Sequence, residues 1–305
     1  MIPTRSSSSR GTAALAVAAA LALGIAATPV QSQTRPAAEK LPPAAAQPPS
    51  TSVFIEELTW TEVRDGLKAG KTTVIVPTGG TEQGGPHVIL GKENYVITYC
   101  AGEIARRLAN SYVAPTLAYV PEGNVEPPSG HMRYPGSITL PEDVFVQVLV
   151  WAGRSFKVTG FKDVVFIGNS GGNQAGMKAA VDQLNKEFAG SGVRAHFVGE
   201  YYYATAPEGR ELSAFDRWII EQGVPENEVG SHVGVRDTST LMAVEALKFK
   251  KGELVRWDKI VNGGGFAGSG VTGNPEYANV AFGDHGLKLK IDATVAKIRE
   301  VTARR

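Results

Sequence analysis

The chain has 305 residues, one cysteine and a formal net charge of +1. A near-neutral chain without a basic stripe is not typical of a nucleic-acid-binding protein, and its charge pattern indicates no membrane-surface partner once a leader is removed. A single cysteine excludes an internal disulfide framework.

The first 32 residues have the pattern of a secretory signal peptide. Arg5 and Arg10 lie in a serine-rich start, an apolar run follows over residues 13–27, and small residues then offer a cleavage position. The apolar run is shorter than the roughly 20 residues that a membrane-spanning helix needs. We therefore expect export to the periplasm or the extracellular space, the alternative being a disordered alanine-rich tail on a cytosolic protein.

The next segment, residues 33–52, is rich in proline, alanine and glutamine. Such a composition cannot bury a core, so it predicts a flexible linker. Residues 53–305 remain, and this length suits a single domain with a sizeable core.

Helix and strand patterns alternate along this domain. A T-x-x-E capping box at Thr59 and Glu62 begins a short helix that ends near residue 67. Strands are predicted at residues 72–76, 113–120, 163–168 and 194–198, and helices at 95–108, 141–156, 174–188, 212–222 and 238–247, with a last helix after residue 286. Strands separated by helices of this length predict an α/β fold with a mostly parallel sheet flanked by helices.

One glycine-rich loop, residues 79–94, carries three groups that could bind a metal ion: Glu82, His87 and Glu93. The loop follows the first predicted strand, and α/β proteins place their ligands at the carboxyl ends of strands. Two carboxylates and an imidazole would suit a divalent cation such as zinc, manganese or iron. The alternative is a turn whose polar side chains are solvated.

Four motifs, in this order, resemble those of the creatininase (creatinine amidohydrolase) family. Residues 77–94, P-T-G-G-T-E-Q-G-G-P-H-V-I-L-G-K-E-N, are similar to P-x-G-x-x-E-Q-H-G-P-H-L-P-x-x-x-D. Y-P-G-S at 134–137 resembles F-P-G-T, and G-N-S-G-G-N at 168–173 resembles N-G-H-G-G-N. S-H-V-G at 231–234 with D-T-S at 237–239 resembles E-H-G-G followed by E-T-S.

The resemblance implies a metal-dependent amidohydrolase with an α/β fold that assembles as a homo-oligomer. It implies a site with two divalent metals, zinc or manganese, and a small amide, in some members cyclic, whose C–N bond is cleaved by a metal-activated water. Here Glu82 and Glu93 stand at carboxylate ligand positions, whereas Gly84 and Ser170 stand where the family has metal-binding histidines. The site is therefore expected to be altered.

The remaining site predictions concern catalysis and substrate. His232 lies at the family's catalytic loop and could approach the metal or pass a proton to the leaving nitrogen. Substrate contacts are expected from His131, Arg133, Tyr202 and Asn173.

The same residues allow two other hypotheses about function. Residues 168–172 fit G-x-S-x-G, so Ser170 could be the nucleophile of a serine hydrolase with Asp237 and His285. Alternatively, the chain is a metal-free pseudoenzyme that keeps the fold and binds a small ligand at its glycine-rich turns.

Overall fold

The computed structural model describes residues 50–208, 211–261, 266 and 268–303. The predicted signal peptide and most of the predicted linker lie outside these residues. None of the helices in the described part combines the length and the apolar character that crossing a membrane requires.

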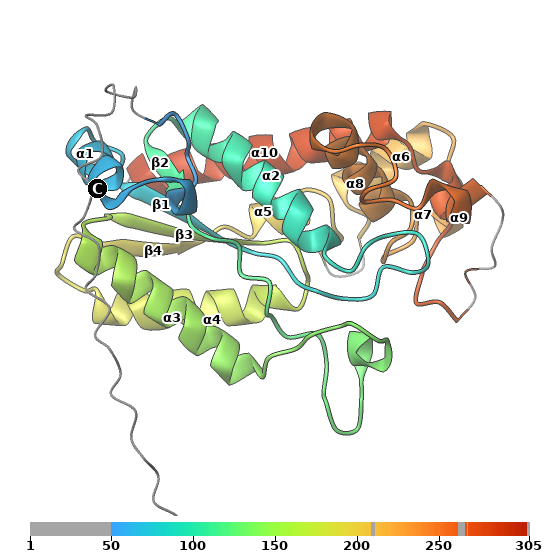
Figure 1. The fold of residues 1–305 in the computed structure, drawn as a ribbon, viewed down its shortest axis with the longest axis horizontal. Coiled ribbons are helices and arrows are strands. Elements are labelled where there is room, and N and C mark those ends of the chain that lie inside the picture. Colours follow the sequence, from blue (N-terminus) through green and yellow to red (C-terminus); the bar gives the residue numbers. More distant parts are fainter. Residues whose placement is uncertain (1–49, 209–210, 262–265, 267, 304–305) are drawn as a thin grey trace, which may run out of the picture. The chain divides into compact units, whose positions relative to one another are not determined.

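Four strands form a parallel sheet in the order β2-β1-β3-β4 (Figure 1). Their bounds are β1 Thr73–Thr78, β2 Ser111–Val113, β3 Asp163–Gly168 and β4 Arg194–Phe197. β1 pairs with β3 along its whole length, from Thr73 opposite Asp163 to Thr78 opposite Gly168. The predicted α/β fold with a parallel sheet between helices is confirmed.

Helices cover both faces of this sheet (Figure 1). α3 and α4 lie on one face, and α2 and α10 lie on the other. The described helices are α1 Trp60–Lys68, α2 Lys92–Leu108, α3 Glu142–Thr159, α4 Asn173–Glu187, α5 Glu200–Tyr203, α6 Ala214–Glu221, α7 Glu226–Val229, α8 Val235–Lys248, α9 Trp257–Val261 and α10 Val280–Ala303, with 3-10 turns η1 Ile55–Glu57, η2 Gly130–Arg133 and η3 Pro275–Tyr277.

Several boundaries differ from the prediction. The second strand ends at Val113 instead of residue 120, because Pro115 has no N–H to continue the ladder and only isolated bridges follow. α2 begins at Lys92, three residues early, and α10 begins at Val280, so it already contains His285. The tyrosine run after β4 forms the short helix α5.

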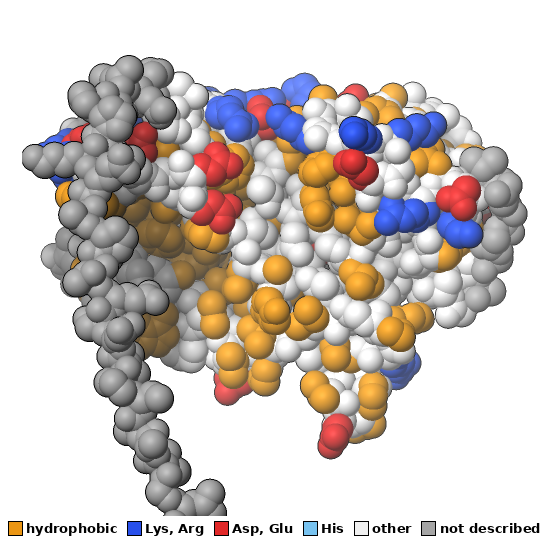
Figure 2. Space-filling model, in the orientation of Figure 1, with side chains coloured by type: hydrophobic (Ala, Val, Ile, Leu, Met, Phe, Trp, Pro, Cys, Tyr) orange, Lys and Arg blue, Asp and Glu red, His pale blue; other side chains and the backbone are white. Residues whose placement is uncertain are grey.

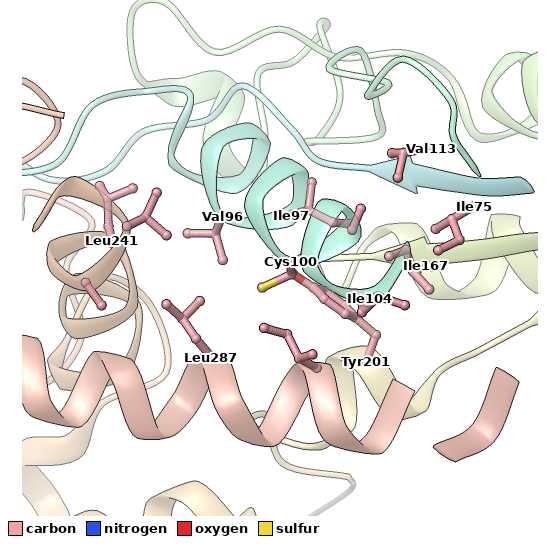
Figure 3. Close-up of a cluster of buried hydrophobic side chains, with 14 of the residues drawn as sticks. Ile75, Val96, Ile97, Cys100, Ile104, Val113, Ile167, Tyr201, Leu241 and Leu287 are labelled. Atoms are coloured by element: carbon pink, nitrogen blue, oxygen red, sulfur yellow. The ribbon is translucent and has the colours of Figure 1, made fainter. Parts of the chain in front are cut away.

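Side chains of the central strands alternate between two apolar clusters, as the two-residue period of a strand requires. One cluster contains Ile75 and Ile167 and is completed by α2, α8 and α10 (Figure 3). The other contains Val76 and Phe166 and is completed by α3 and α4. A sheet buried on both faces explains why β1 is apolar without interruption.

Candidate metal centre and active site

The candidate site lies where β1 and β3 end. These strands are neighbours, but the helices that follow them, α2 and α4, pack on opposite faces of the sheet. The loop after β1 and the turn after β3 therefore diverge, and a crevice opens at such a switch point. A cavity of about 270 Å³ occupies it, and its charged or ring-bearing lining residues are Glu82, Lys92, Glu93, His131, Tyr202, Phe215, His232, Arg236, Asp237 and Lys290.

Asn173 fixes the start of the loop after β1. Its side-chain amide donates to the carbonyl of Gly79 at 2.8 Å and to the hydroxyl of Thr78 at 3.0 Å. Asn173 is fully buried and does not line the cavity. The structure thus places this predicted substrate contact between β1 and α4, where it holds two turns together.

Glu82 is the centre of the polar network. Its carboxylate is buried, and its Oε2 lies 3.0 Å from Nε2 of His131 while its Oε1 lies 3.8 Å from Nδ1 of His232. The two imidazoles lie against each other with ring centroids 4.7 Å apart. Each of these three residues offers one ligand atom, and the three atoms all lie within 4.8 Å of one another.

This trio fits a catalytic metal site by the chemistry of its donors. Two histidines and one glutamate are a ligand set of hydrolytic zinc enzymes, which leave a further position for water. The backbone fixes His232, because its Nε2 is 3.1 Å from the carbonyl oxygen of Gln83 and its Nδ1 faces Glu82. A bond from the second ring nitrogen to a carbonyl is the usual way in which a ligating histidine is oriented.

Lys92 places a positive charge beside this trio. Its ammonium donates to Oε1 of Glu82 and, at 2.6 Å, to Oε1 of Glu93, and all three side chains are buried. The second oxygen of Glu93 accepts from the amide of Asn169, whose own oxygen accepts from the hydroxyl of Tyr201 at 2.9 Å. Lys92 is thereby locked between two carboxylates.

Burial and neighbouring charges set the protonation of these groups. Burial alone would raise the pKa of Glu82, but the charge of Lys92 and the contact with His131 hold it well below its ordinary value. Burial, with Glu82 nearby, raises the pKa of Glu93 in spite of Lys92. Burial and the charge of Lys92 lower the pKa of His232, which keeps its imidazole neutral and able to ligate a metal.

The ligand set differs from the predicted one. His87 is buried elsewhere: its Nε2 lies 3.1 Å from the hydroxyl of Thr238 and 3.2 Å from the carbonyl of Val233, and its ring packs against Phe266. Between Glu82 and Glu93, where a cation was predicted, lies the ammonium of Lys92. The reason is local, since the loop folds His87 into the core and the first turn of α2 points Lys92 into the site.

Among the described residues, Ser170, Asp237 and His285 do not form the triad that a serine hydrolase requires. Ser170 lines the cavity, but the ring of His285 stacks on Trp218 with centroids 3.9 Å apart and does not line it. Asp237 accepts from the backbone N–H of Val233 at 2.8 Å. A nucleophile elbow is also strained, whereas the described non-glycine residues with positive φ are Ala109 and Val233.

Of the predicted substrate contacts Tyr202 and Arg133, only Tyr202 lines the cavity. Tyr202 lines the cavity, and burial raises the pKa of its phenol to about 12, so that it can donate a hydrogen bond. Arg133 is exposed in η2, where its Nε lies 3.4 Å from the carbonyl of Pro128, and it does not line the cavity. His131, from the same turn, joins Glu82 and His232 in the candidate metal site.

Sequence reasoning missed Lys92 and Glu122. A lysine in the first turn of a helix opposes the helix dipole, and this was the available signal for a special role of Lys92. Glu122 gave no signal, because it lies in the segment between β2 and η2 and in no recognisable motif. Burial and the charge of Glu82 raise the pKa of Glu122 to about 10, so it is a neutral acid beside the trio at pH 7.

Comparison with known proteins finds relatives that hydrolyse amides or peptides. The creatinine amidohydrolase of Pseudomonas putida is 24% identical over 216 residues, which are 70% of this chain and 77% of that protein. The mycofactocin precursor peptide peptidase of Mycobacterium tuberculosis is 28% identical over 130 residues, 40% of this chain, and the match spans only 49% of that relative's length.

Solved creatininase structures share the fold. One has a TM-score of 0.65 at 20% identity and covers 82% of this chain and 98% of its own. Others that match are described as a manganese creatininase, a mutant of Zn–Zn type and a mutant complexed with creatine. A model of the Creatininase family, described as creatinine amidohydrolase, matches residues 56–298. Because that match extends over most of the sequence, the chain belongs to the creatininase family.

Proposed function

We propose that this protein hydrolyses a C–N bond of a small amide, cyclic or open-chain, with one divalent cation, zinc or manganese, held by Glu82, His131 and His232. The observation that carries the proposal is this trio, two imidazoles and a carboxylate, at the switch point of a creatininase fold. The names of the related proteins, a creatinine amidohydrolase and a peptidase, support amide hydrolysis as the class of reaction.

A cation bound there would polarise the substrate carbonyl and lower the pKa of a water molecule to about 7. The residues around it would orient the substrate and move protons. Asp237 lines the cavity, and the charges of Lys92 and Arg236 lower its pKa against the effect of burial, so it is an ionised carboxylate that can accept a proton. Tyr202 is a neutral donor that lines the same cavity.

The size and lining of the cavity favour a small polar substrate. Its volume of about 270 Å³ accommodates a compact ring and little more. Arg236 and Lys290 line the same space, and both are buried. A compact amide with an oxygen or carboxylate for these cations is therefore the substrate class that we propose.

The test is an assay of small cyclic amides and formamides with the purified chain, before and after chelation and after return of zinc or manganese. We expect turnover that chelation abolishes and metal restores, and His131→Ala should lose it. Arg133→Ala is the matched control, because Arg133 lies two residues away in the same turn but outside the cavity. Turnover that survives chelation, or that falls equally in both variants, would refute the proposal.

A second candidate is a metal-free protein that binds a small ligand without cleaving it. Lys92 favours this candidate, because its ammonium already neutralises Glu82 and Glu93. The same panel separates the two, since ligand binding without any metal uptake or turnover is what the second candidate predicts.

Export is a further part of the proposal. The basic start, the short apolar run and the small residues before residue 33 support removal of a signal peptide and a periplasmic or extracellular protein. Mass spectrometry of protein recovered from the exporting cell should find an N-terminus between Thr28 and Gln33. Recovery of the chain from the cytosol with Met1 intact would contradict export.

We also infer that the chain forms a homo-oligomer. An exposed apolar stripe on α3 supports it: Val144, Val148, Trp151 and Val158 follow a spacing of three, four or seven residues and lie on one face of the helix. Hydrophobic side chains are visible over α3 on the face shown in Figure 2. A stripe of this kind is what a second helix of another copy would cover.

A further inference from the structure

The cavity contains a second cationic position besides the metal trio, and a side chain fills it. The ammonium of Lys92 lies between Oε1 of Glu82 and Oε1 of Glu93. The side chain of Lys92 is 2% exposed, and those of the two glutamates are 4% and 8% exposed. Two buried carboxylates this close together need a positive charge between them, because each would otherwise be desolvated and repelled by the other.

We propose that Lys92 replaces a second metal ion, so that the site binds one divalent cation at Glu82, His131 and His232 and supplies the other positive charge from its own sequence. A related creatininase structure is described as Zn–Zn type, which shows that this fold can hold two cations. The single-cation half of the inference rests on the proposed function. The replacement by Lys92 rests on the geometry alone.

Glu82 can serve both the metal ion and Lys92, whereas Glu93 serves Lys92 alone. Glu82 presents Oε1 to Lys92 and Oε2 to His131, so it can ligate a metal through Oε2 and still hold the ammonium. Glu93 presents Oε1 to Lys92 and Oε2 to Asn169, so both of its oxygens are already engaged. The trio is therefore left with one shared carboxylate, and Glu93 serves Lys92.

The loop leaves no room for the imidazole that a second metal would require nearby. A Cβ at Gly84 would lie 2.7 Å from the carbonyl oxygen of Val88 and 3.0 Å from its Cβ, so no side chain fits without moving the backbone. At the end of β3, the side chains that line the cavity are the amide of Asn169, which already donates to Glu93, and the hydroxyl of Ser170, and neither is a usual zinc ligand. The second position is thus built for an ammonium.

Lys92 also keeps a hydrogen-bond donor for the cavity that it lines. An ammonium has three N–H bonds, and within the described part of the chain two of them go to Glu82 and Glu93. A substrate oxygen beside the metal trio is a suitable acceptor for the third. The residue would then act on the substrate as a fixed cation.

The experiment is to measure bound manganese per chain, by native mass spectrometry and calorimetry, in wild type and Lys92→Ala. Wild type should bind one ion. Lys92→Ala should bind one more, because Glu82, Glu93 and the nearby Asp237 are then carboxylates without their cation, and such oxygens suit manganese. Manganese should also raise the thermal midpoint of Lys92→Ala more than that of wild type.

Lys290→Ala is the matched control. Lys290 is a second buried lysine on the same cavity, but its ammonium lies over the ring of Tyr201 and 3.5 Å from a backbone carbonyl instead of between carboxylates. This variant should bind the same number of ions as wild type. An equal gain in both variants would overturn the inference, because it would reflect loss of positive charge alone.

The outcomes also separate this inference from the proposed function. Two manganese ions in wild type, with Lys92 intact, would overturn the replacement and would do so even if no variant folds. No ion in wild type but one in Lys92→Ala would refute the metal trio while supporting Lys92 as a substitute cation. An unchanged count in a folded Lys92→Ala would overturn the inference.

Discussion

At Glu82, one buried carboxylate meets an ammonium and two imidazoles. Glu82 therefore matters for stability as well as for chemistry, because loss of the ammonium of Lys92 would leave its buried negative charge uncompensated. Removing one partner of a buried ion pair commonly costs about 3–5 kcal/mol, whereas exposed pairs contribute little.

Glu82→Gln should accordingly lose both metal binding and stability. We expect the free energy of unfolding to fall by about 3–5 kcal/mol, because the ammonium of Lys92 keeps only one carboxylate. Glu187→Gln is the control, since Glu187 also pairs with a cation, Arg154, but at the surface. Urea unfolding compares the two, and equal losses would show that the buried network contributes nothing special.

His87, which is not one of the proposed metal ligands, makes the stability of the fold depend on pH. Burial lowers its pKa from 6.5 to about 4, so the unfolded chain binds this proton more readily than the folded chain. The stabilisation is complete above pH 6.5 and is lost as the pH falls through about 4, by roughly 3 kcal/mol from this residue.

His87→Gln should therefore flatten the dependence of stability on pH between about 6.5 and 4. It keeps a hydrogen-bond donor for Val233 and Thr238 but does not titrate. Thermal midpoints across this range provide the measurement. An unchanged slope in the variant would show that His87 is not the group responsible, and lost metal binding at pH 7 would return it to the ligand set.

At the scale of elements, the loop after β1 decides which ligands are possible. A Cβ at Gly84 would lie 2.7 Å from the carbonyl oxygen of Val88, whereas the nearest atom to a Cβ at Gly91 would be 3.5 Å away, in the ring of Tyr95. Overpacking of a tight site typically costs about 1–3 kcal/mol.

Gly84→Ala should thus lower the thermal midpoint more than Gly91→Ala, which is its control in the same loop. Gly84→His should restore the family's motif without restoring a second metal ion. If Gly84→His were as stable as wild type and bound two ions, the loop would not be the cause of the altered site.

Much of the element pattern was predictable because its signals are local. The capping box at Thr59 forms as expected, with the backbone N–H of Thr59 donating to Glu62 at 2.8 Å.

The site was only partly predictable. Glu82 could be chosen from its loop, but His131 reaches it from a turn about fifty residues later. Lys92, in the first turn of α2, and His87, in the loop just before it, face different ways, and this depends on packing that no spacing encodes.

For the whole molecule, the apolar stripe on α3 makes assembly testable. Trp151 is 62% exposed and lies at the middle of the stripe, so Trp151→Glu should break a homo-oligomer into smaller species in light scattering. Leu247→Glu is the control, because Leu247 is an exposed apolar residue on α8. A monomeric wild type at micromolar concentration would remove the homo-oligomer from the proposal, and an oligomer that survives Trp151→Glu would move the interface elsewhere.

The central claim is that one metal ion lies at Glu82, His131 and His232 while Lys92 occupies the neighbouring cationic position. Anomalous diffraction at the zinc or manganese absorption edge, from crystals grown with that metal, tests it most directly. We expect a single peak within ligand distance of Glu82 Oε2, His131 Nε2 and His232 Nδ1, with the ammonium of Lys92 still between Glu82 and Glu93. Two peaks, or a single peak between Glu82 and Glu93 with Lys92 displaced, would contradict it.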